Sequence, residues 1–452
     1  MRDDTTRNPS SVVPEAGGPA ATEGSAEAEA RHPALKGGDD VMLMPRTTAE
    51  VAAILAAANQ ERVAVFPCGL GTSLAGGLAK TRQGLVVSSQ QFNRLVGIDS
   101  ANLAATVEPG VLLADLQAAV ERIGLFFPPD PLGEQTATMG SVIARNARGL
   151  RALKYGSAKD YILGLEAVLA DGTILHTGAR TVKNTSGYDL TRLLTGSRGT
   201  LAYITQATIR LLPLPVARIL VVATFADLGA AAGTALSLLA TKVIPAALEL
   251  LDNTALRWLA VPSLGLTQDT PAALLVELDG GEKGVAYQNE VVAKVLKEGG
   301  ADETGVFEEA GERSAILSAY RQALAALLGQ GEPRRVHRLR ASRAQLQPLL
   351  LEAKRLAAGA NLPAAVVCHV GMGEVCLLLD RREKDAGEPG PAARLMAELR
   401  RLSALDGRPG GNDPRETGVA LRLELMHRLK AAFDPRGILN PDGGPFAREG
   451  RS

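Results

Sequence analysis

The sequence predicts an α+β protein of more than one domain, and three observations lead to this prediction. The chain has 452 residues, more than one hydrophobic core usually spans, so two or more domains are expected. In the first half, short β-branched runs alternate with capped, periodic helical segments. After Pro215, strand–helix–strand units follow one another, which is typical of an α+β domain with an antiparallel sheet.

Composition excludes several classes of function. The 49 basic residues equal the 49 acidic ones, so there is no basic surplus for nucleic acid or acidic lipid. No apolar run reaches the roughly 18–20 residues that a membrane helix needs, and the N-terminus lacks the apolar core of a signal peptide. Three cysteines form no disulfide framework, which is typical of the cytoplasm.

The first half of the chain contains recognisable elements in order. Residues 1–37 have almost no large apolar side chain, so we expect a disordered tail. Thr47 begins a helix with the sequence VAAILAAAN. The further expected elements are strands at 63–67, 84–89 and 103–107, a helix at 111–124, a long ligand-wrapping loop at 128–160, a hairpin at 163–178 turning at Asp171-Gly172, and a β run at 201–215.

The second half is expected to form one sheet with covering helices. Strands are predicted at 218–225, 245–252 and 272–280, helices at 228–240 and 285–300, and a strand–turn–strand unit at 366–380. A helix followed by a Pro/Gly-closed tail ends the chain at 421–443.

A glycine-dense loop, GLGTSLAGG at 69–77, follows the strand that ends at Pro67. Backbone without Cβ atoms lets successive N–H groups surround an anion, and Thr72 and Ser73 add hydroxyl donors, so the loop fits a pyrophosphate cradle. It lacks the Lys of a Walker A loop and the spacing of the dinucleotide fingerprint. A tight structural turn is the alternative.

Two further segments carry small residues close together. The run PPDP at 128–131 precedes TMGSVIARNARG at 138–149, whose small side chains allow flat packing against a ring system. Asn146 could bond polar groups of a ring or a ribose. KNTSGYDL at 183–190 leads to GSRGTL at 196–201.

In order and spacing, these motifs resemble the FAD-binding (PCMH-type) domain of vanillyl-alcohol oxidase-type flavoproteins, and among them the FAD subunits of glycolate oxidase, D-lactate dehydrogenase and D-2-hydroxyglutarate dehydrogenase. The resemblance runs from about Met44 to Pro215 and returns at 434–441. It implies an α+β fold with a two-subdomain FAD-binding domain at 38–215, an α+β cap domain for the substrate at 216–425, and a C-terminal segment at 426–452 that returns to the FAD domain.

The resemblance also implies the cofactor contacts. They are Pro67, Gly69, Gly71, Thr72, Ser73, Gly76, Pro131, Met139, Gly140, Ser141, Asn146, Gly149, Tyr155, Gly199, Ile204 and Asn440. Ser141 stands where the family usually has a second Gly, and Arg148 where it has Gly or Ala. The glycine loop carries no His for covalent attachment, so noncovalent FAD is expected.

On the substrate side the chain departs from the family. Relatives carry a metal motif His-x-Gly-Asp-Gly-Asn-x-His and a base in Glu-His-Gly-Ile-Gly. Here the first reads His369 to Cys376, with Cys in place of the second His. The second begins at Glu416, and Thr417 replaces the base. His369, Cys376 and Glu416 could ligate zinc, but remnants on a strand–turn–strand are the alternative, and a divalent metal is not expected.

The resemblance implies roles for two arginines. Arg321 stands where relatives carry a substrate-facing Arg, which makes it the candidate carboxylate clamp. Arg338 stands where relatives carry an acidic residue. With His369 and Glu416, Arg321 completes the candidate catalytic set.

Two functions remain open from the sequence. In one, FAD takes a hydride at N5 from a small 2-hydroxy acid such as glycolate or D-lactate, and electrons pass to a quinone, iron–sulfur or flavoprotein acceptor. In the other, the chain is a FAD subunit without its own turnover that supports an active FAD-domain homologue. Both imply a small anionic substrate, a FAD-domain homologue and an iron–sulfur subunit as partners, and a cytoplasmic location that partners could bring to the inner membrane.

Overall fold

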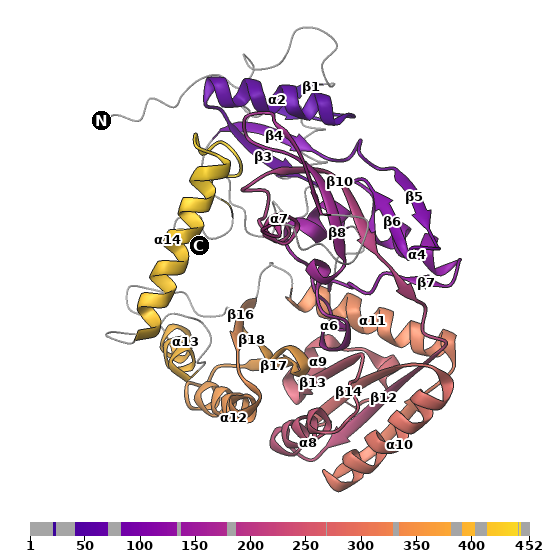
Figure 1. Ribbon diagram of the computed structural model, residues 1–452. Coiled ribbons are helices and arrows are strands. Elements are labelled where there is room, and N and C mark those ends of the chain that lie inside the picture. The colour runs from indigo at the N-terminus through magenta and orange to yellow at the C-terminus, as the bar shows by residue number, and fades with distance from the viewer. Residues whose placement is uncertain are drawn as a thin grey trace.

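The computed structural model describes residues 21–23, 41–70, 83–132, 137–178, 187–267, 269–328, 334–380, 391–402, 414–441 and 443. Helices and mostly antiparallel sheets make up these residues, so the predicted α+β class is confirmed. Figure 1 shows two halves, with the N-terminal half above a large sheet formed by the later residues. Helices α6 (Ala152–Tyr155) and α11 (Ala310–Leu328) lie where the halves meet.

A small parallel sheet begins the N-terminal half. Its parallel strands run in the order β2 (Val41–Leu43), β4 (Gly84–Ser88) and β3 (Ala64–Cys68). Helix α2 (Thr48–Glu61) connects β2 to β3 and begins as predicted, because the Thr47 hydroxyl accepts a hydrogen bond from the N–H of Glu50. Its apolar face packs on the sheet through Val51, Ile54 and Leu55.

The predicted disordered tail at 1–37 falls mostly outside the described residues. Within it, Ala21–Glu23 form strand β1, which pairs antiparallel with β2. A bare sheet edge offers unpaired N–H and C=O groups, so a polar segment can add to it without an apolar core of its own.

An antiparallel five-stranded sheet completes the N-terminal half. Its order is β5 (Leu95–Asp99), β6 (Ala104–Val107), β10 (Tyr203–Arg210), β8 (Ile162–Val168) and β9 (Ile174–Gly178). The predicted hairpin is confirmed, since β8 pairs with β9 across the turn at Asp171-Gly172. Helix α4 (Leu113–Glu121) packs beside β7 (Leu125–Phe126), which pairs with β11 (Leu212–Pro213).

The prediction of one long loop over 128–160 is wrong in part. The segment contains helix α5 (Met139–Ala144), helix α6 and a 3-10 turn at Ala158–Asp160. The Thr138 hydroxyl caps α5 by accepting from the N–H of Ser141. Helices of four to six residues are too short to show hydrophobic periodicity. Helix α7 (Leu190–Leu194) is another, capped by Asp189.

A seven-stranded antiparallel sheet forms the second half. Its order is β15 (Ala301–Phe307), β12 (Ala217–Phe225), β14 (Ala272–Gly280), β13 (Ala247–Asp252), β17 (Ala364–His369), β18 (Glu374–Asp380) and β16 (Arg334–Arg340). Alternate residues of β12 enter two different cores: Val221 and Ala223 pack on one face, Leu220 and Val222 on the other. Both faces are therefore covered by helices.

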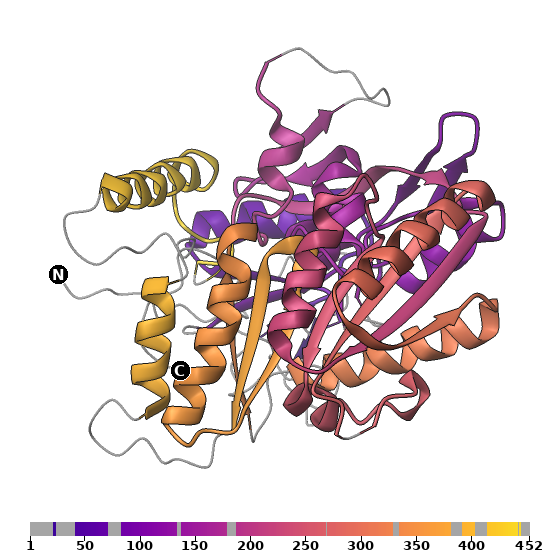
Figure 2. The same ribbon diagram turned by 90° about the horizontal axis from the view of Figure 1, so that it is seen from below.

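The helices divide between the two faces. Helices α8 (Leu228–Ala240), α10 (Glu282–Glu298), α12 (Arg343–Gly359) and α13 (Pro391–Leu402) pack on the outer face, side by side in Figure 2. Helices α9 (Asn253–Leu259) and α11 pack on the inner face, toward the N-terminal half. The inner core also takes up Leu150 from the N-terminal half, so one apolar cluster joins the two halves.

The C-terminal segment returns to the N-terminal half. Helix α14 (Pro414–Phe433) is continuous across the predicted boundary at 425, and the return starts at its last turn. The N–H of Asn440 donates to Val65 O at 2.7 Å, and Leu439 forms a bridge with Val65 of β3. The 434–441 motif therefore contacts β3 through its backbone.

A buried lysine fastens this return. Lys430 Nζ donates to Thr200 O at 2.7 Å, Leu439 O at 2.6 Å and the Asp434 carboxylate at 2.5 Å. Burial lowers the pKa of Lys430, while Asp434 opposes that shift. The three acceptors together satisfy the ammonium donors.

None of the helices in the described ranges is long and apolar enough to span a bilayer.

We expect Lys430→Met to lower the free energy of unfolding by about 3 kcal/mol, because it leaves the Asp434 carboxylate buried without its cation. Urea denaturation measures the loss. Arg428→Met is the matched control on the same helix: its pair with Glu424 is exposed on both sides, so we expect a change below about 0.5 kcal/mol. Equal shifts in the two variants would contradict this role of Lys430.

Candidate functional site

The two predicted cofactor stretches meet at their ends. A Cβ added at Gly69 would lie 2.7 Å from the Thr138 hydroxyl oxygen, so the start of the glycine loop lies directly against the cap of α5. Gly71, Thr72, Ser73 and Gly76 lie outside the described residues. A common binding site for 69–77 and 138–149 stays a prediction.

Glycines of this site are required by close contacts within the protein. A Cβ at Gly149 would lie 1.7 Å from Asp130 O, and one at Gly140 would lie 2.8 Å from Pro109 Cβ. Gly199, with φ 69°, packs against Pro67. These contacts bring the 128–131 and 138–149 segments together, and Pro131 bridges to Gly149. Backbone packing is therefore one reason for the glycines, beside the predicted approach of a ring.

Two asparagines predicted to contact the cofactor hold strained backbone. Asn146 and Asn440 have φ values of 48° and 40°. The Asn146 side-chain oxygen accepts from the N–H of Lys159, and Asn440 Nδ2 donates to Arg198 O. Asn and Gly tolerate this conformation best. Contacts of both amides with a cofactor stay a prediction.

The other predicted cofactor residues lie in several environments. Met139 is fully buried in the core of the N-terminal half, so its side chain packs in that core beneath the site. Pro67, Pro131, Ser141 and Ile204 are half-buried.

Tyr155, whose cofactor contact stays a prediction, also makes a contact that was not predicted. Its hydroxyl donates to the Asp279 carboxylate at 2.7 Å, which assigns this group to the contact between the two halves. Burial and Asp279 raise the pKa of Tyr155 above its usual value. Its neighbour Lys154 is paired with the same carboxylate, and Arg151 binds Glu277 at two points, 2.9 and 3.2 Å.

Sequence reasoning missed these partners on the second half. Glu277 and Asp279 lie in the otherwise apolar strand β14 and are 1% and 0% exposed. Carboxylates inside an apolar strand were the available signal, since a buried charge requires a partner.

His369 lies in a buried polar cluster on the inner face of the large sheet. Its Nδ1 is 2.6 Å from Glu249 Oε2, and the Tyr320 hydroxyl donates to the same oxygen at 3.2 Å. Burial alone would lower the pKa of His369, but Glu249 and Cys376 raise it well above its usual value. The Glu249 carboxylate therefore occupies Nδ1, one of the two ring nitrogens that could ligate a metal. Glu249 was not predicted.

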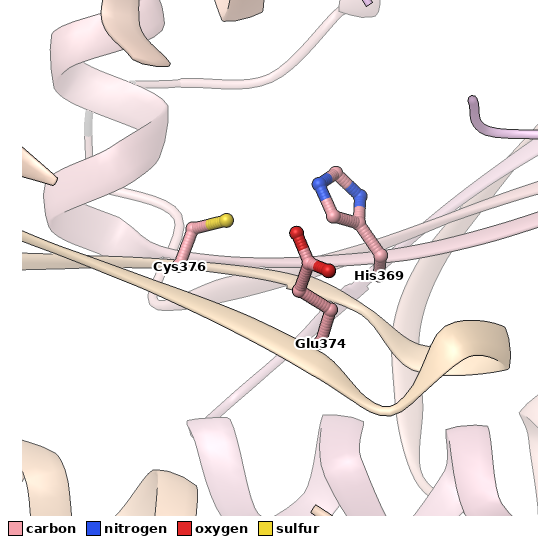
Figure 3. Close-up of side chains that lie close together, drawn as sticks. All are labelled: His369, Glu374 and Cys376. Carbon is pink, nitrogen blue, oxygen red and sulfur yellow. The ribbon is translucent and has the colours of Figure 1, made fainter. Parts of the chain in front are cut away.

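The predicted metal set is changed by the structure. Ligand atoms of His369, Glu374 and Cys376 all lie within 4.8 Å of one another (Figure 3). Glu416 lies in α14, and its side chain falls outside the described residues. Glu374 occupies the place of the family motif's Asn and was not predicted.

The surroundings of Glu374 oppose a metal. Its carboxylate pairs with Arg148, and the Nε of Arg338 lies 3.7 Å away. Two guanidinium groups beside the same carboxylate repel a divalent cation. The residues present therefore do not fit a catalytic metal in this arrangement. Arg148 and Arg338, two departures from the family pattern, both pair with Glu374, which is a third.

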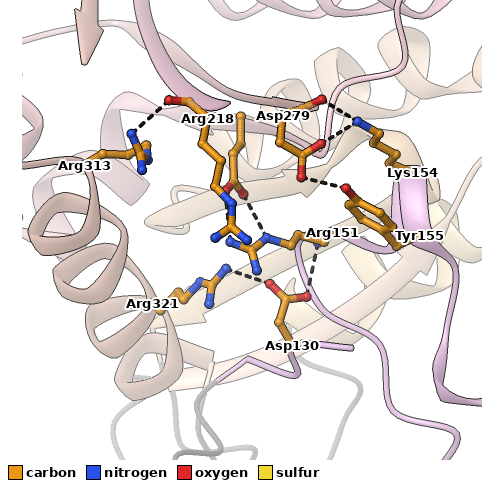
Figure 4. A network of polar contacts seen from close by, with 9 residues as sticks. Asp130, Arg151, Lys154, Tyr155, Arg218, Asp279, Arg313 and Arg321 are labelled. Atoms are coloured by element: carbon orange, nitrogen blue, oxygen red, sulfur yellow. Dashed lines mark hydrogen bonds and ion pairs between the residues drawn. The ribbon is translucent and has the colours of Figure 1, made fainter. Parts of the chain in front are cut away.

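Arg321, the predicted carboxylate clamp, lines a cavity between the two halves. Its Nη2 binds Asp130 Oδ2 at 2.7 Å, as Figure 4 shows, and its Nε is buried without a hydrogen-bond partner. Asp130 adjoins Pro131, a predicted flavin contact. Asp130 therefore holds Nη2 of Arg321, while Nε lacks an acceptor among the described residues.

Comparison with known proteins gives family matches over most of the chain. A family described as "FAD binding domain" matches residues 40–178, and one described as "FAD linked oxidases, C-terminal domain" matches 214–411 and 415–443.

Individual relatives agree with this. The glycolate oxidase subunit GlcD of Bacillus subtilis (strain 168) is 36% identical and covers 91% of this chain and 90% of its own length. The D-lactate dehydrogenase of Archaeoglobus fulgidus is 32% identical, covering 89% and 90%.

Solved structures share the fold. An alkyldihydroxyacetonephosphate synthase superimposes with a TM-score of 0.69 at 19% identity, covering 89% of this chain and 77% of its own. p-Cresol methylhydroxylase gives a TM-score of 0.68 at 16% identity, covering 89% and 88%.

We expect Gly149→Ala to lower bound flavin per chain at least about tenfold, because its Cβ would displace the Asp130 backbone. Visible flavin absorbance relative to protein measures this. Gly97→Ala on β5, with nothing within 4 Å of the added Cβ, is the control and should keep full flavin. Full flavin in both variants would show that the 149 contact is not required.

Proposed function

The chain belongs to the FAD-linked oxidases, and from that premise we propose that it oxidises a small 2-hydroxy acid and passes the electrons to a separate acceptor. It is an oxidoreductase with FAD as its cofactor. Glycolate and D-lactate are the substrates named for its relatives, and they are the first candidates here. Bound FAD supplies the hydride acceptor.

The position of Arg321 carries this proposal. Arg321 lines the cavity, so a substrate carboxylate there can accept from its guanidinium while Asp130 holds Nη2. Pro131, next to Asp130, bridges to Gly149 in the stretch predicted to hold the flavin. Substrate and cofactor sites would therefore be adjacent, as hydride transfer requires.

Asp130 is the proposed proton acceptor. Thr417 cannot take a proton near neutral pH, whereas Asp130 adjoins Arg321 and is 5% exposed. Burial raises the pKa of Asp130, against the lowering by Arg321 and Arg151. A carboxylate with raised proton affinity beside the carboxylate clamp suits general base catalysis of alcohol oxidation.

His369 acts as a positioning residue in this proposal. Through Glu249 it is linked to Tyr320, the residue before Arg321 on α11. His369 Nδ1 and the Tyr320 hydroxyl both contact Glu249 Oε2, so Glu249 connects His369 to the helix that carries the clamp. Glu416 stays a predicted catalytic residue without a described side chain.

A second function is supported by the contacts of Glu374. Arg148 comes from the predicted flavin stretch and Arg338 from β16, and both turn to Glu374 in the former metal motif. An internal ion-pair network at this place would oppose turnover. The chain would then be a catalytically inactive FAD-binding subunit that supports an active homologue in a glycolate oxidase-like complex.

Anaerobic reduction distinguishes the two functions. The FAD-loaded chain alone, mixed with glycolate or D-lactate without oxygen, should lose its visible flavin absorbance if it turns over. A yellow protein that stays oxidised, but is reduced after the triple change Glu374→Asn, Cys376→His and Thr417→His, would favour the supporting subunit. A chain that cannot be loaded with FAD would contradict both.

We expect Arg321→Met to raise the half-saturating substrate concentration for flavin reduction at least about tenfold, since a charge-assisted hydrogen bond is lost. Stopped-flow reduction at varied substrate concentration measures it. Arg355→Met, whose pair with Glu352 lies on the exposed side of α12, should leave this concentration unchanged. An unchanged value in Arg321→Met would remove Arg321 as the clamp.

A further inference from the structure

The cavity that contains Arg321 extends well beyond it. Its volume is about 690 Å³, within the range of small-molecule sites. One wall is α4 with Leu113 and Gln117, the opposite wall is the first turns of α11, and Arg218 at the start of β12 closes the end. The cavity therefore spans the junction of the two halves of the chain.

Cations outnumber anions around this cavity. The charged side chains that line it are Arg151, Arg218, Arg313, Arg321, Asp130 and Glu277. Figure 4 shows the guanidinium groups of Arg151, Arg218 and Arg321 turned toward one another. Such a group of like charges is stable only with enough counter-charge.

The two carboxylates are already engaged. Glu277 accepts two hydrogen bonds from Arg151, and Asp130 accepts from Arg321 Nη2 and from the N–H of Arg151. Arg218 forms no ion pair with either. Its Nη2 is buried without a hydrogen-bond partner, and so is Nε of Arg321.

Packing within the protein satisfies Arg218 only in part. Its guanidinium lies 5.2 Å from the centre of the Phe126 ring, which stabilises the face of the cation. The N–H edge still lacks an acceptor, and a buried donor without one is destabilising. Burial and Arg151 together lower the pKa of Arg218, so a second cation close by adds to the strain.

We propose that this cavity binds a small dianion, with one anionic group on Arg218 and the other on Arg321. Phosphate and short dicarboxylates share the required chemistry, namely two negative charges and several acceptor oxygens in a small volume. Ser314 and Ser318 of α11 line the same cavity and add hydroxyl donors.

Such a ligand would regulate the proposed reaction. The inference rests on the proposed function in one respect only, because the dianion shares Arg321 with the 2-hydroxy acid and the two would exclude each other. Arg218 lies on β12 and Arg321 on α11, so a bound dianion also joins two elements of the second half. Binding itself requires no turnover.

Calorimetry on the FAD-loaded full chain tests the proposal. Succinate and inorganic phosphate are titrated separately, with acetate as the monoanion. We expect saturable binding of at least one dianion and at least tenfold weaker binding of acetate. The stronger of the two dianions identifies the ligand type. No binding of either dianion, or equal binding of acetate, would overturn the proposal.

Three variants locate the site. Arg218→Met should weaken dianion binding at least tenfold, and Arg355→Met on the exposed side of α12 should leave it unchanged. Ala114→Glu places a carboxylate in the exposed first turn of α4, where it suits the helix dipole and leaves every arginine in place. It should abolish binding by occupying the arginines.

Each result bears on the site independently of folding defects. Should Arg218→Met fail to retain FAD, Ala114→Glu decides alone. Dianion binding that persists at wild-type strength in Ala114→Glu would place the ligand elsewhere and overturn the inference. The dianion could bind although 2-hydroxy acids fail to reduce the bound flavin. That result would contradict the proposed reaction and support the dianion site.

Discussion

The rest of the structure depends on a set of buried ion pairs between helix α6 and strand β14. Arg151 binds Glu277 at two points, and Lys154 and Tyr155 share Asp279. The carboxylates of Glu277 and Asp279 on β14 are almost fully buried, so each requires its cationic or hydroxyl partner. Because α6 directly follows the predicted flavin stretch, the same contacts orient the large sheet over that stretch.

Two clusters with different chemistry lie around helix α11. Tyr320 points to the buried pair of His369 and Glu249, and the next residue, Arg321, points into the cavity beside Asp130. Helix α11 therefore connects a cluster of paired polar groups to a cavity that contains unpaired N–H donors. The paired cluster around His369 suits fixing the position of α11. The cavity around Arg321 suits binding an anion from solution.

Motif reasoning found residues whose function follows from backbone chemistry. Gly69, Gly149 and the return at Asn440 lie together near β3 and α5, because glycine-rich turns and Pro/Gly-closed segments leave signals in the order of residues. Glu249 and Glu374 were missed, since each has its role only through a partner from a distant element. The bond between Tyr155 and Asp279 was missed for the same reason, because the two residues are 124 positions apart.

The sequence by itself determined the α+β class, the β8–β9 hairpin and the glycine-rich stretches that the FAD-binding family shares, because periodicity, turn residues and motif spacing are local properties. Only the tertiary structure decided that Arg148, Glu374 and Arg338 form one network and that Arg218 and Arg321 face one cavity. The physical reason is that electrostatic energy depends on distance in space and on burial, and neither can be read from positions along the chain.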